Sequence, residues 1–526
     1  MKSLSLLLCV ILGITLHAQD LNEDFGASGR VIFDLDNLDE LVGVFQDDDG
    51  NIYFYGNTSE NLGGIYPFDL YIGKMNQLGE IDPSFGVDGI YRTDCPGNTI
   101  TSINSAVWDT SGIYLMGRAS NSGIVDTNTF FISKIDHTGN LNLDFADDGY
   151  FIHDFLGTYN TPGELLMDAQ GKLVFCGSTE DDEGTGYEFP MVGRLLQNGD
   201  RDSTFGTTGV IVYDMFAGAL TDEFEVPAYT YKHGEGGYLD KIIEVNNNYY
   251  AAGGYLLTAN THLNLVSINK DGEFNADFSI PGPFIFQSDV GGNHYLKSLT
   301  YHNGKVLMGI ETDGLMDQES LIQIVDTTGT LISLTELANV ERDLRTRGLI
   351  QYNDLIFVGE YSKLHSSTSP GYHSDDFEFA ALDDNYNLRT DLFDEGFYRV
   401  DVDSDDELGL ECLHIIDDKM FLGGYMNNVS GSNFTDIVFI GLSLVNDLSS
   451  EGRNTKTLQI FPNPSRDYIQ LSKEGEYKIF DLQGKLIKSG QNKMNEIIDI
   501  QSLEPGAYLI HVLNNHSRSA VRFIKN

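Results

Sequence analysis

The chain has 526 residues, of which 79 are Asp or Glu and 32 are Lys or Arg, giving a net charge of −47. This length exceeds one ordinary hydrophobic core, so several domains or a repeat array are expected. The acidic balance argues against a nucleic-acid partner and against anionic membrane surfaces, because both require clustered Lys and Arg.

The first 18 residues predict a signal peptide. Lys2 supplies the positive charge, residues 4–16 form a short apolar stretch, and Ala18 is the small residue before the cut. The apolar stretch is too short for a membrane-spanning helix, and no later run is long enough. We therefore expect an exported protein with no membrane span. Three cysteines remain after cleavage, too few for a disulfide framework.

A short phrase then recurs with a period of 60 residues. Each copy has Asn or Asp, two further residues, Phe, then Gly or Ala, and a Gly three residues later. The four clear copies are centred on Phe25, Phe85, Phe145 and Phe205. Degenerate copies follow at residues 275–278 and 391–396. A fixed period of this kind indicates a repeat architecture.

Each repeat also contains an apolar run that ends in glycine and is followed by a polar loop and a second apolar run. The glycine-ended runs are residues 51–56, 113–117, 172–177, 249–253, 305–309, 355–359 and 419–423. Two further apolar runs precede them in each unit, as in residues 29–34 and 41–46. Enrichment in Val, Ile, Tyr and Phe, with Gly, Asn and Asp between the runs, indicates β-strands joined by tight turns.

Four short strands in each of seven units predict an all-β fold, a seven-bladed β-propeller over residues 19–447. Radially repeated four-stranded sheets hide their strand edges, which favours a closed ring. An open β-solenoid is the alternative. We interpret the charged segment 336–348, whose Leu spacing also suits a helix, as the connection between the first two strands of unit six.

The phrase Asp-x-Ser-Phe-Gly-x-x-Gly, best preserved at residues 82–89, resembles the delta-sixty repeat of bacterial secreted and surface proteins. The resemblance covers residues 19–447 and is stronger in the first four units than in the last three. It implies a propeller-like body. It implies no activity, because one fold serves many functions.

The sequence changes character after a polar linker at residues 448–454. About seven short strands in residues 455–526 predict a small Ig-like β-sandwich. This tail resembles the type A C-terminal sorting domain of type IX secretion in Gram-negative bacteria, and the alternative is a generic sandwich. The resemblance is carried by Pro462, Asn463, Pro464, Gly484, Gly506, Tyr508 and Lys525. It implies export through the type IX machinery, followed by release or attachment to the outer-membrane surface.

No catalytic constellation is recognisable from spacing. Zinc signatures, Gly-x-Ser-x-Gly elbows and phosphate loops are missing from the sequence. Asp401, Asp403 and Asp405 alternate as calcium ligands would, but Asp406 stands where glycine is needed and Cys412 where a glutamate is needed. We interpret this segment as a solvated acidic loop, with a calcium site as the alternative, and expect no other cofactor.

The regular turns of the predicted propeller fall on one face and the irregular segments on the other. The irregular segments are residues 215–238, 360–376 and 401–408. Insertions of this kind commonly form a binding face. Tyr229, Tyr231 and His233 in the longest segment are therefore candidate ligand-binding residues, the alternative being that they pack the loop onto the ring.

Two functions from different classes remain open, besides a purely structural spacer. The first is a non-enzymatic secreted or surface protein that binds a glycan, a protein or a matrix polymer. The second is an extracellular polysaccharide hydrolase, which needs two converging carboxylates, one with a raised pKa.

Overall fold

The computed structural model describes residues 16–525 apart from a series of mostly short segments. The segments left out are residues 23, 37, 61–67, 97, 99, 121–127, 158, 181–186, 215–218, 223–235, 258–259, 276, 279–283, 287–292, 314–319, 338–341, 365–374, 394–395, 401–406, 428–434, 447–459, 462–464, 472–474, 482–484, 494–496, 504–505 and 515–516.

The chain divides into two compact units, Met1–Val445 and Asn446–Asn526. All regular secondary structure in the described residues is β-strand, which confirms the all-β class predicted from the sequence. Among these residues no helix has the length and hydropathy needed to cross a membrane.

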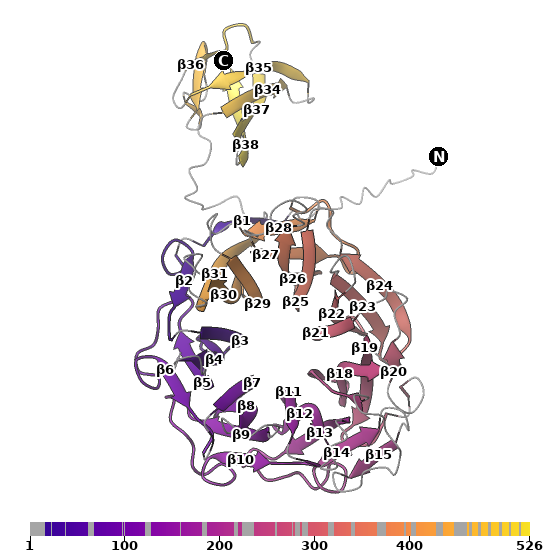
Figure 1. Cartoon of the computed structure of the whole chain (residues 1–526). Helices are drawn as coiled ribbons and strands as arrows, with labels where there is room; N and C mark the ends of the chain where they lie inside the picture. Colours follow the sequence, from indigo (N-terminus) through magenta and orange to yellow (C-terminus); the bar gives the residue numbers. More distant parts are fainter. Residues whose placement is uncertain are drawn as a thin grey trace, which may run out of the picture. The chain divides into compact units, whose positions relative to one another are not determined.

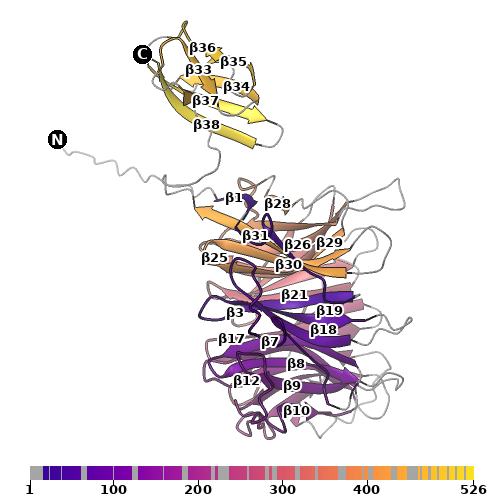
Figure 2. The same cartoon turned by 90° about the vertical axis from the view of Figure 1, so that its left-hand side faces the viewer.

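The strands of the first unit form antiparallel sets arranged around a ring (Figures 1 and 2), and each set is named here by its first strand. In Figure 1 the first strands β3, β7, β11, β21, β25 and β29 lie nearest the centre. The sets are β3 (Leu38–Gln46), β4 (Ile52–Ser59), β5 (Phe68–Met75) and β6 (Ile90–Thr93); β7 (Ile100–Asp109), β8 (Gly112–Ser120), β9 (Thr129–Ile135) and β10 (Tyr150–His153); β11 (Asn160–Met167), β12 (Leu173–Glu180), β13 (Glu188–Leu195) and β14 (Val210–Asp214); β17 (Lys241–Val245), β18 (Asn248–Leu257), β19 (Asn260–Asn269) and β20 (Phe284–Phe286); β21 (Asn293–His302), β22 (Lys305–Asp313), β23 (Ser320–Asp326) and β24 (Leu331–Leu337); β25 (Arg342–Tyr352), β26 (Leu355–Leu364), β27 (Asp375–Leu382) and β28 (Phe397–Val400); and β29 (Glu407–Ile416), β30 (Lys419–Asn427) and β31 (Thr435–Asn446) with β2 (Arg30–Phe33).

Three shorter strands attach to these sets. β1 (Leu16–Leu21) pairs with β31, β15 (Ala219–Asp222) pairs with β14, and β16 (Gly236–Gly237) pairs with β13 and β18. The predicted cleavage after Ala18 would fall inside β1.

The N-terminal strand β2 closes the ring by completing the β29 set. It lies antiparallel to β31, with Arg30 opposite Ile440. The backbone N–H of Asn22 also donates to the carbonyl of Gly441 at 2.8 Å. The two ends of the body are therefore held in one sheet.

Sheet membership differs by one strand from our interpretation of the sequence. We placed residues 29–34 in one unit with residues 41–46, whereas β2 pairs with β31 and β6 pairs with β5, Tyr91 lying opposite Ile72. The reason is that the phenylalanine phrase folds as a compact turn. It returns the chain onto the strand that it has just left.

The phrase around Phe85 explains why its residue types recur. Asp82 Oδ1 accepts from the backbone N–H of Ser84 at 3.0 Å, and Phe85 is 1% exposed. Gly86 and Gly89 have φ values of 57° and 92°, which favour glycine. The N–H of Gly86 donates to the carbonyl of Thr138 in the next repeat at 2.8 Å. The phrase therefore links neighbouring sets as well as turning the chain.

In the degenerate copy near residue 392, Leu392 takes the phenylalanine position and Phe393 does not. Leu392 is 2% exposed, and its N–H donates to the carbonyl of Arg389 as that of Phe85 does to Asp82. The phrase therefore begins at Arg389, where the clear copies have Asn or Asp, and not at residue 391 as the sequence pattern predicts.

The strand-ending glycines are explained by a bulge in the first strand of several sets. In the β3 set the register shifts between Leu41 and Gly43, so the carbonyl of Glu40 approaches β4. A Cβ at Gly56 would lie 1.8 Å from this carbonyl oxygen. The same close approach occurs at Gly117, Gly177, Gly253 and Gly424, with distances of 2.0, 2.4, 2.2 and 1.9 Å.

The charged segment 336–348 is strand at both ends, in contrast to the connection that we expected. β24 ends at Leu337 and β25 begins at Arg342. Within β25, buried Leu344 and Thr346 alternate with Arg345 and Arg347, which is the period of a strand.

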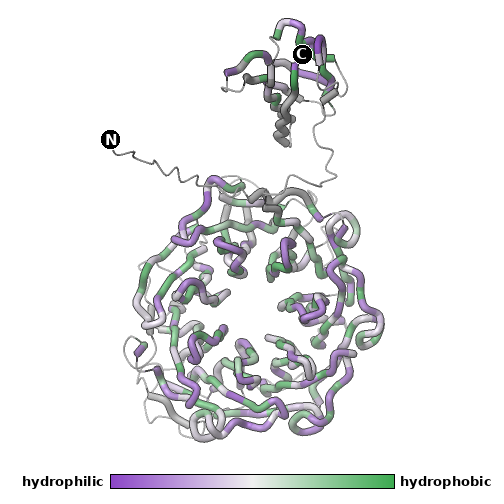
Figure 3. Tube along the Cα trace, turned by 180° about the vertical axis from the view of Figure 1, so that it is seen from behind, coloured by the Kyte–Doolittle hydropathy of each residue, from purple (hydrophilic) through white to green (hydrophobic). Residues whose placement is uncertain are grey.

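Hydrophobic cores lie between adjacent sets. Between the β3 and β7 sets, for example, Tyr53 and Leu70 pack with Ile113 and Phe131. Figure 3 shows hydrophobic residues spread along strands all around the ring. Each set therefore depends on both neighbours for burial.

The second compact unit contains two sheets. One holds β32 (Ile460–Phe461), β33 (Tyr468–Leu471) and β36 (Ile497–Asp499), and the other holds β35 (Leu486–Asn492), β34 (Gly475–Asp481), β37 (Gly506–Asn514) and β38 (Ser517–Lys525). A shared core joins them, and it includes Ile469 and Ile498 of one sheet with Ile479 and Ile510 of the other.

Candidate functional site

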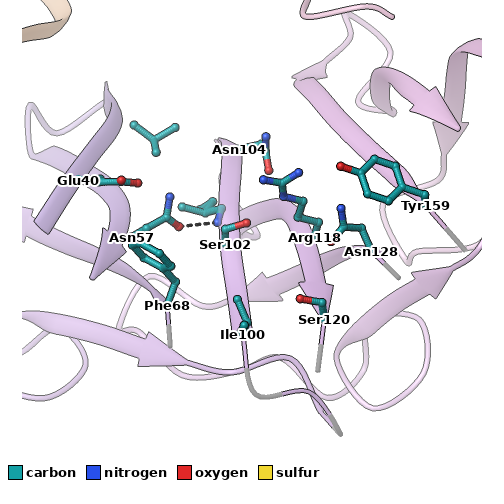
Figure 4. Close-up of a pocket in the computed structure, with 12 residues that line it drawn as sticks. Glu40, Asn57, Phe68, Ile100, Ser102, Asn104, Arg118, Ser120, Asn128 and Tyr159 are labelled. Carbon is teal, nitrogen blue, oxygen red and sulfur yellow. Dashed lines mark hydrogen bonds between the residues drawn. The ribbon is translucent and has the colours of Figure 1, made fainter. Parts of the chain in front are cut away.

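A pocket of about 670 Å³ lies where the β3 and β7 sets meet. It is lined by Glu40, Val42, Asn57, Phe68, Ile100, Ser102, Ile103, Asn104, Arg118, Ser120, Asn128 and Tyr159, most of which are labelled in Figure 4. Most of these side chains are polar, and two are aromatic. In the rest of the article it is called the main pocket.

The main pocket opens on one face of the ring because its residues sit at strand ends. Phe68 begins β5, Ile100 begins β7 and Ser120 ends β8. All three ends lie on the face where the second strand of each set finishes. The sequence analysis associated this face with ligand binding, but in other units.

Arg118 is positioned by β8 directly opposite Ser102 of β7. In Figure 4 its guanidinium points into the main pocket, between Asn104 and Tyr159. Within the described part of the chain this guanidinium forms no hydrogen bond and no ion pair. It is therefore available to a ligand.

Several other polar groups in the main pocket are also free to bind. The side chains of Ser102, Ser120 and Asn128 have no hydrogen-bond partner among the residues that the structure describes. Asn104 Nδ2 donates to the carbonyl of Pro162 at 3.0 Å, whereas its Oδ1 atom is buried without a partner. Buried polar atoms in folded proteins rarely lack a hydrogen-bond partner. The unpartnered Oδ1 atom of Asn104 therefore points to a bound water molecule or ligand in the pocket.

The opposite end of the main pocket is formed by Glu40 and Asn57, which are paired across β3 and β4. Asn57 Oδ1 accepts a hydrogen bond from the backbone N–H of Ile103 at 2.8 Å (Figure 4). This bond fixes the β3 set against the β7 set. The Glu40 side chain is exposed to the pocket.

A second pocket of about 570 Å³ shares Glu40 and Val42 with the main pocket and extends toward the β29 set. It also contains Glu411 and Tyr425. Burial raises the pKa of Glu411, an effect that Arg347 and Lys297 oppose and that Glu40 adds to. Asp39 also lines this pocket, and burial raises its pKa, so three carboxylates, two of them with a raised pKa, line the same hollow.

Cations on the first strands of other sets pair with nearby carboxylates. Lys241 Nζ lies 3.6 Å from Glu164 Oε1, and Lys297 Nζ lies 3.3 Å from Glu311 Oε2. These cations are neutralised within the ring wall, unlike Arg118. Among the described residues that line the main pocket, Arg118 is the cation and has no carboxylate partner.

Three carboxylates meet where β2, β3 and β31 adjoin. Ligand atoms of Asp34, Asp39 and Asp436 lie within 4.8 Å of one another. Asp39 Oδ2 accepts from the backbone N–H of Leu35 at 2.7 Å, and Oδ1 accepts from Thr58 Oγ1 at 2.6 Å. The buried Asp39 is thus used to hold the chain that enters β3.

The predicted ligand residues Tyr229, Tyr231 and His233 lie outside the described residues, as do Asp401, Asp403 and Asp405. Pro462, Asn463, Pro464 and Gly484 of the sorting motif also lie outside them. The remaining motif residues are described: Gly506 begins β37, Tyr508 is 9% exposed in the core of the second unit, and Lys525 is 8% exposed and bridges to Ser465.

The main-pocket residues were missed by the sequence analysis, although one signal was present. The residue after the strand-ending glycine is Asn57, Arg118 or Ser178 in the first three units, so an arginine stands out there in an acidic chain. Nothing local marks Ser102, Asn128 or Tyr159, which reach the pocket only when neighbouring sets pack together.

Residues 459–526 match a family model described as a secretion system C-terminal sorting domain. The protein is secreted. The matched segment lies within the second compact unit and confirms the type IX sorting tail expected from the sequence. Such a tail implies interaction with the type IX machinery.

Solved structures with similar chains have low identity to this secreted protein. They include a protein of unknown function from Dyadobacter fermentans (11% identity, 79% of this chain and 98% of that chain, TM-score 0.37) and an ulvan lyase of a polysaccharide lyase family (10%, 79% and 96%, 0.40). A levansucrase of B. megaterium is a third (11%, 59% and 87%, 0.30). At these scores we base no functional argument on them. A comparison with curated proteins gives no match.

Proposed function

We propose that this protein is a secreted or cell-surface seven-bladed β-propeller that binds a polar extracellular polymer, an oligosaccharide chain in the first place, in the main pocket. The observation that carries the proposal is a hollow of about 670 Å³ lined by hydroxyl, amide and guanidinium groups that have no partner among the described residues, together with two aromatic rings.

The propeller count is part of this proposal. It is supported by the antiparallel strand sets that begin with β3, β7, β11, β17, β21, β25 and β29 and by the closure of the last set through β2. The Ig-like sandwich is proposed for the tail on its two sheets around one core.

The chemistry of the main pocket suits a sugar chain. Hydroxyl groups of a sugar both donate and accept hydrogen bonds, which Ser102, Ser120 and Asn128 can satisfy. The rings of Phe68 and Tyr159 offer apolar surfaces for the C–H faces of a sugar ring. A volume of about 670 Å³ falls in the range of small-molecule sites and holds a few sugar units.

A protein partner fits these observations less well. Stable protein interfaces bury roughly 800 Å² on each partner and centre on apolar anchors, whereas this hollow is lined mainly by polar groups. A recessed polar pocket selects a narrow, hydroxyl-rich chain.

The proposal is tested by isothermal titration calorimetry of the mature secreted protein against a panel of neutral and acidic oligosaccharides. Tyr159→Ala should weaken binding about 10-fold or more, as expected for loss of an aromatic contact. Tyr301→Ala, which removes an exposed tyrosine of β21, is the matched control and should bind as the wild type does. Absence of binding to every oligosaccharide would refute the proposed function.

A polysaccharide hydrolase is the second candidate, favoured by Glu40 and Glu411 in the second pocket. Glu411, with its raised pKa, would protonate the leaving oxygen, and Glu40 would act as base or nucleophile. This candidate predicts that the wild type releases reducing ends from a bound polysaccharide and that Glu411→Gln abolishes the release while leaving binding intact. Binding without any release of reducing ends would leave the first candidate alone.

A further inference from the structure

We infer that the ligand of the main pocket carries an isolated anionic group, a carboxylate or a sulfate on a sugar unit, and that Arg118 is the residue that recognises it. This inference rests on the proposed function, because it names the class of glycan that the same pocket takes. Its support is the unpaired Arg118 guanidinium and the groups around it.

An unpaired arginine facing a hollow is unusual in this protein. Acidic residues outnumber basic ones by 79 to 32, so a cation readily finds a carboxylate. The described cations on the first strands do: Arg347 and Arg345 lie 2.8 and 3.7 Å from Glu311, and Lys297 and Lys241 lie 3.3 and 3.6 Å from Glu311 and Glu164. Arg118 has no such neighbour in the described residues.

The surroundings of Arg118 suit an oxyanion. A guanidinium presents paired N–H donors that match a carboxylate or a sulfate, and the match is stronger for a charged acceptor than for a hydroxyl. Ser102 lies directly across the strand pair from it, and Ser120 and Asn128 line the same wall. Each of these can add a hydrogen bond to the same group.

The equivalent positions in other sets show that the arginine is not required by the fold. The sets can be aligned on the bulge in their first strands. In this alignment the position of Arg118 is taken by Asn57 of β4, Ser178 of β12 and Tyr425 of β30. Asn57 uses the position to bind the next set through Ile103 N. Arg118 makes no such contact, so its charge faces the pocket instead.

The charge of the whole body limits the class of anion. Residues 1–454 contain 22 basic and 72 acidic residues, and this field repels a dense polyanion. One guanidinium neutralises one charge. The ligand is therefore a sugar chain whose anionic groups are spaced by neutral units or are engaged one at a time.

The experiment compares pairs of ligands with the same sugar chain, one member with its anionic groups free and the other with them esterified or removed. Oligogalacturonate is titrated into the mature protein beside its methyl ester, and a sulfated galactan oligosaccharide beside its desulfated form. We expect at least one acidic member to bind the wild type about 10-fold more tightly than its neutral counterpart. A preference within the galacturonate pair identifies a carboxylate, and one within the galactan pair identifies a sulfate.

Variants assign that preference to Arg118. In Arg118→Gln the acidic and neutral members of the preferred pair should bind with about equal affinity. Arg118→Lys should retain part of the preference for the acidic member. Arg399→Gln, which removes an exposed arginine of β28, should leave the preference unchanged. As a measurement on the wild type alone, inorganic sulfate should compete with the acidic ligand and not with the neutral one.

The outcomes separate this inference from the proposed function. Equal affinity for acidic and neutral members, or a preference that survives in Arg118→Gln, overturns the inference while the pocket remains a glycan site. Failure of every oligosaccharide to bind the wild type refutes the proposed function and the inference with it.

Discussion

The guanidinium of Arg347 donates a hydrogen bond to Glu311 Oε2 at 2.8 Å, and this pair joins β25 to β22 across the boundary between two strand sets. Lys297 and Arg345 approach the same carboxylate at 3.3 and 3.7 Å. Glu311 is 7% exposed, so it compensates three cations in a partly dry setting.

Replacement of Glu311 by Gln should therefore destabilise the body by about 1.5–3 kcal/mol at neutral pH, because charged hydrogen-bond partners are left uncompensated. Burial alone would raise the pKa of Glu311, but Lys297, Arg347 and Arg345 hold it below its ordinary value. A depressed pKa contributes stability above the pKa of the unfolded chain, and this stability is lost as pH falls through the folded pKa. Urea unfolding between pH 3 and pH 7 should show a smaller acid loss in Glu311→Gln than in the wild type. Asp271→Asn, at an exposed carboxylate, is the control and should follow the wild-type curve.

The glycines beside the bulges make a steric prediction. Gly56→Ala places a methyl group 1.8 Å from the Glu40 carbonyl oxygen and should cost about 2–3 kcal/mol or more. Gly304→Ala is the matched control, since its φ is 79° and nothing lies within 4 Å of the added carbon. Only backbone strain of about 1–2 kcal/mol is expected there. Equal melting temperatures for the two variants would contradict this account of the strand-ending glycines.

For Glu360 we expect the opposite pH dependence of stability from that of Glu311. It occupies, in β26, the position that is glycine in β4, and it is 0% exposed. Burial raises the pKa of Glu360 to about 8; the hydroxyl of Ser320 lowers it and Glu378 raises it further. A raised folded pKa gives stability that is complete below the unfolded pKa, near 4.5, and is lost as pH rises toward 8.

Glu360→Gln should therefore be more stable than the wild type at pH 8, on the order of 1–3 kcal/mol, and equal to it at pH 4. Differential scanning calorimetry at pH 4, 6 and 8 measures this difference. Glu336→Gln changes an exposed glutamate of a neighbouring set and should shift nothing. A constant difference across the three pH values would exclude titration of Glu360 as the cause.

The sorting domain makes a prediction about location. Tyr508 packs into the core that joins the two sheets of the tail, so Tyr508→Ala should unfold or loosen this unit. The fraction of protein in the medium and on the cell surface, measured by immunoblot of cell fractions, should fall toward that of a chain lacking residues 459–526. Tyr468→Ala, at a tyrosine of the same unit that is 41% exposed, should be exported normally.

The strands and turns could be predicted from the sequence because their causes are local. Phe85 and Gly89 mark a turn that local hydrogen bonds close, from Phe85 N–H to the Asp82 carbonyl and from Gly89 N–H to the Phe85 carbonyl. Alternation of buried and exposed residues likewise marks β3 and β7. Which strand pairs with which was not accessible, because β6 has the same pattern whether it belongs to the set before it or the set after it.

The pocket could not be predicted for a related reason. Glu40, Arg118 and Tyr159 belong to three different strand sets or their connections, and they converge only when whole sets pack side by side. The rule that irregular segments mark the binding face selected the side of the ring on which the main pocket opens. It selected residues 229–233, which lie outside the described part of the chain, and passed over the short segments beside β4 and β8.

The pairing of β2 with β31 joins the N-terminal and C-terminal ends of the body in one sheet. The backbone N–H of Asp39 donates to Thr435 Oγ1 at 3.0 Å, although the two residues are 396 positions apart in the sequence. Almost the whole body must therefore be synthesised before these two ends can pair. Loss of either end by proteolysis would bare strand edges able to recruit another chain. The predicted cut after Ala18 would leave β2, which begins at Arg30, in the chain.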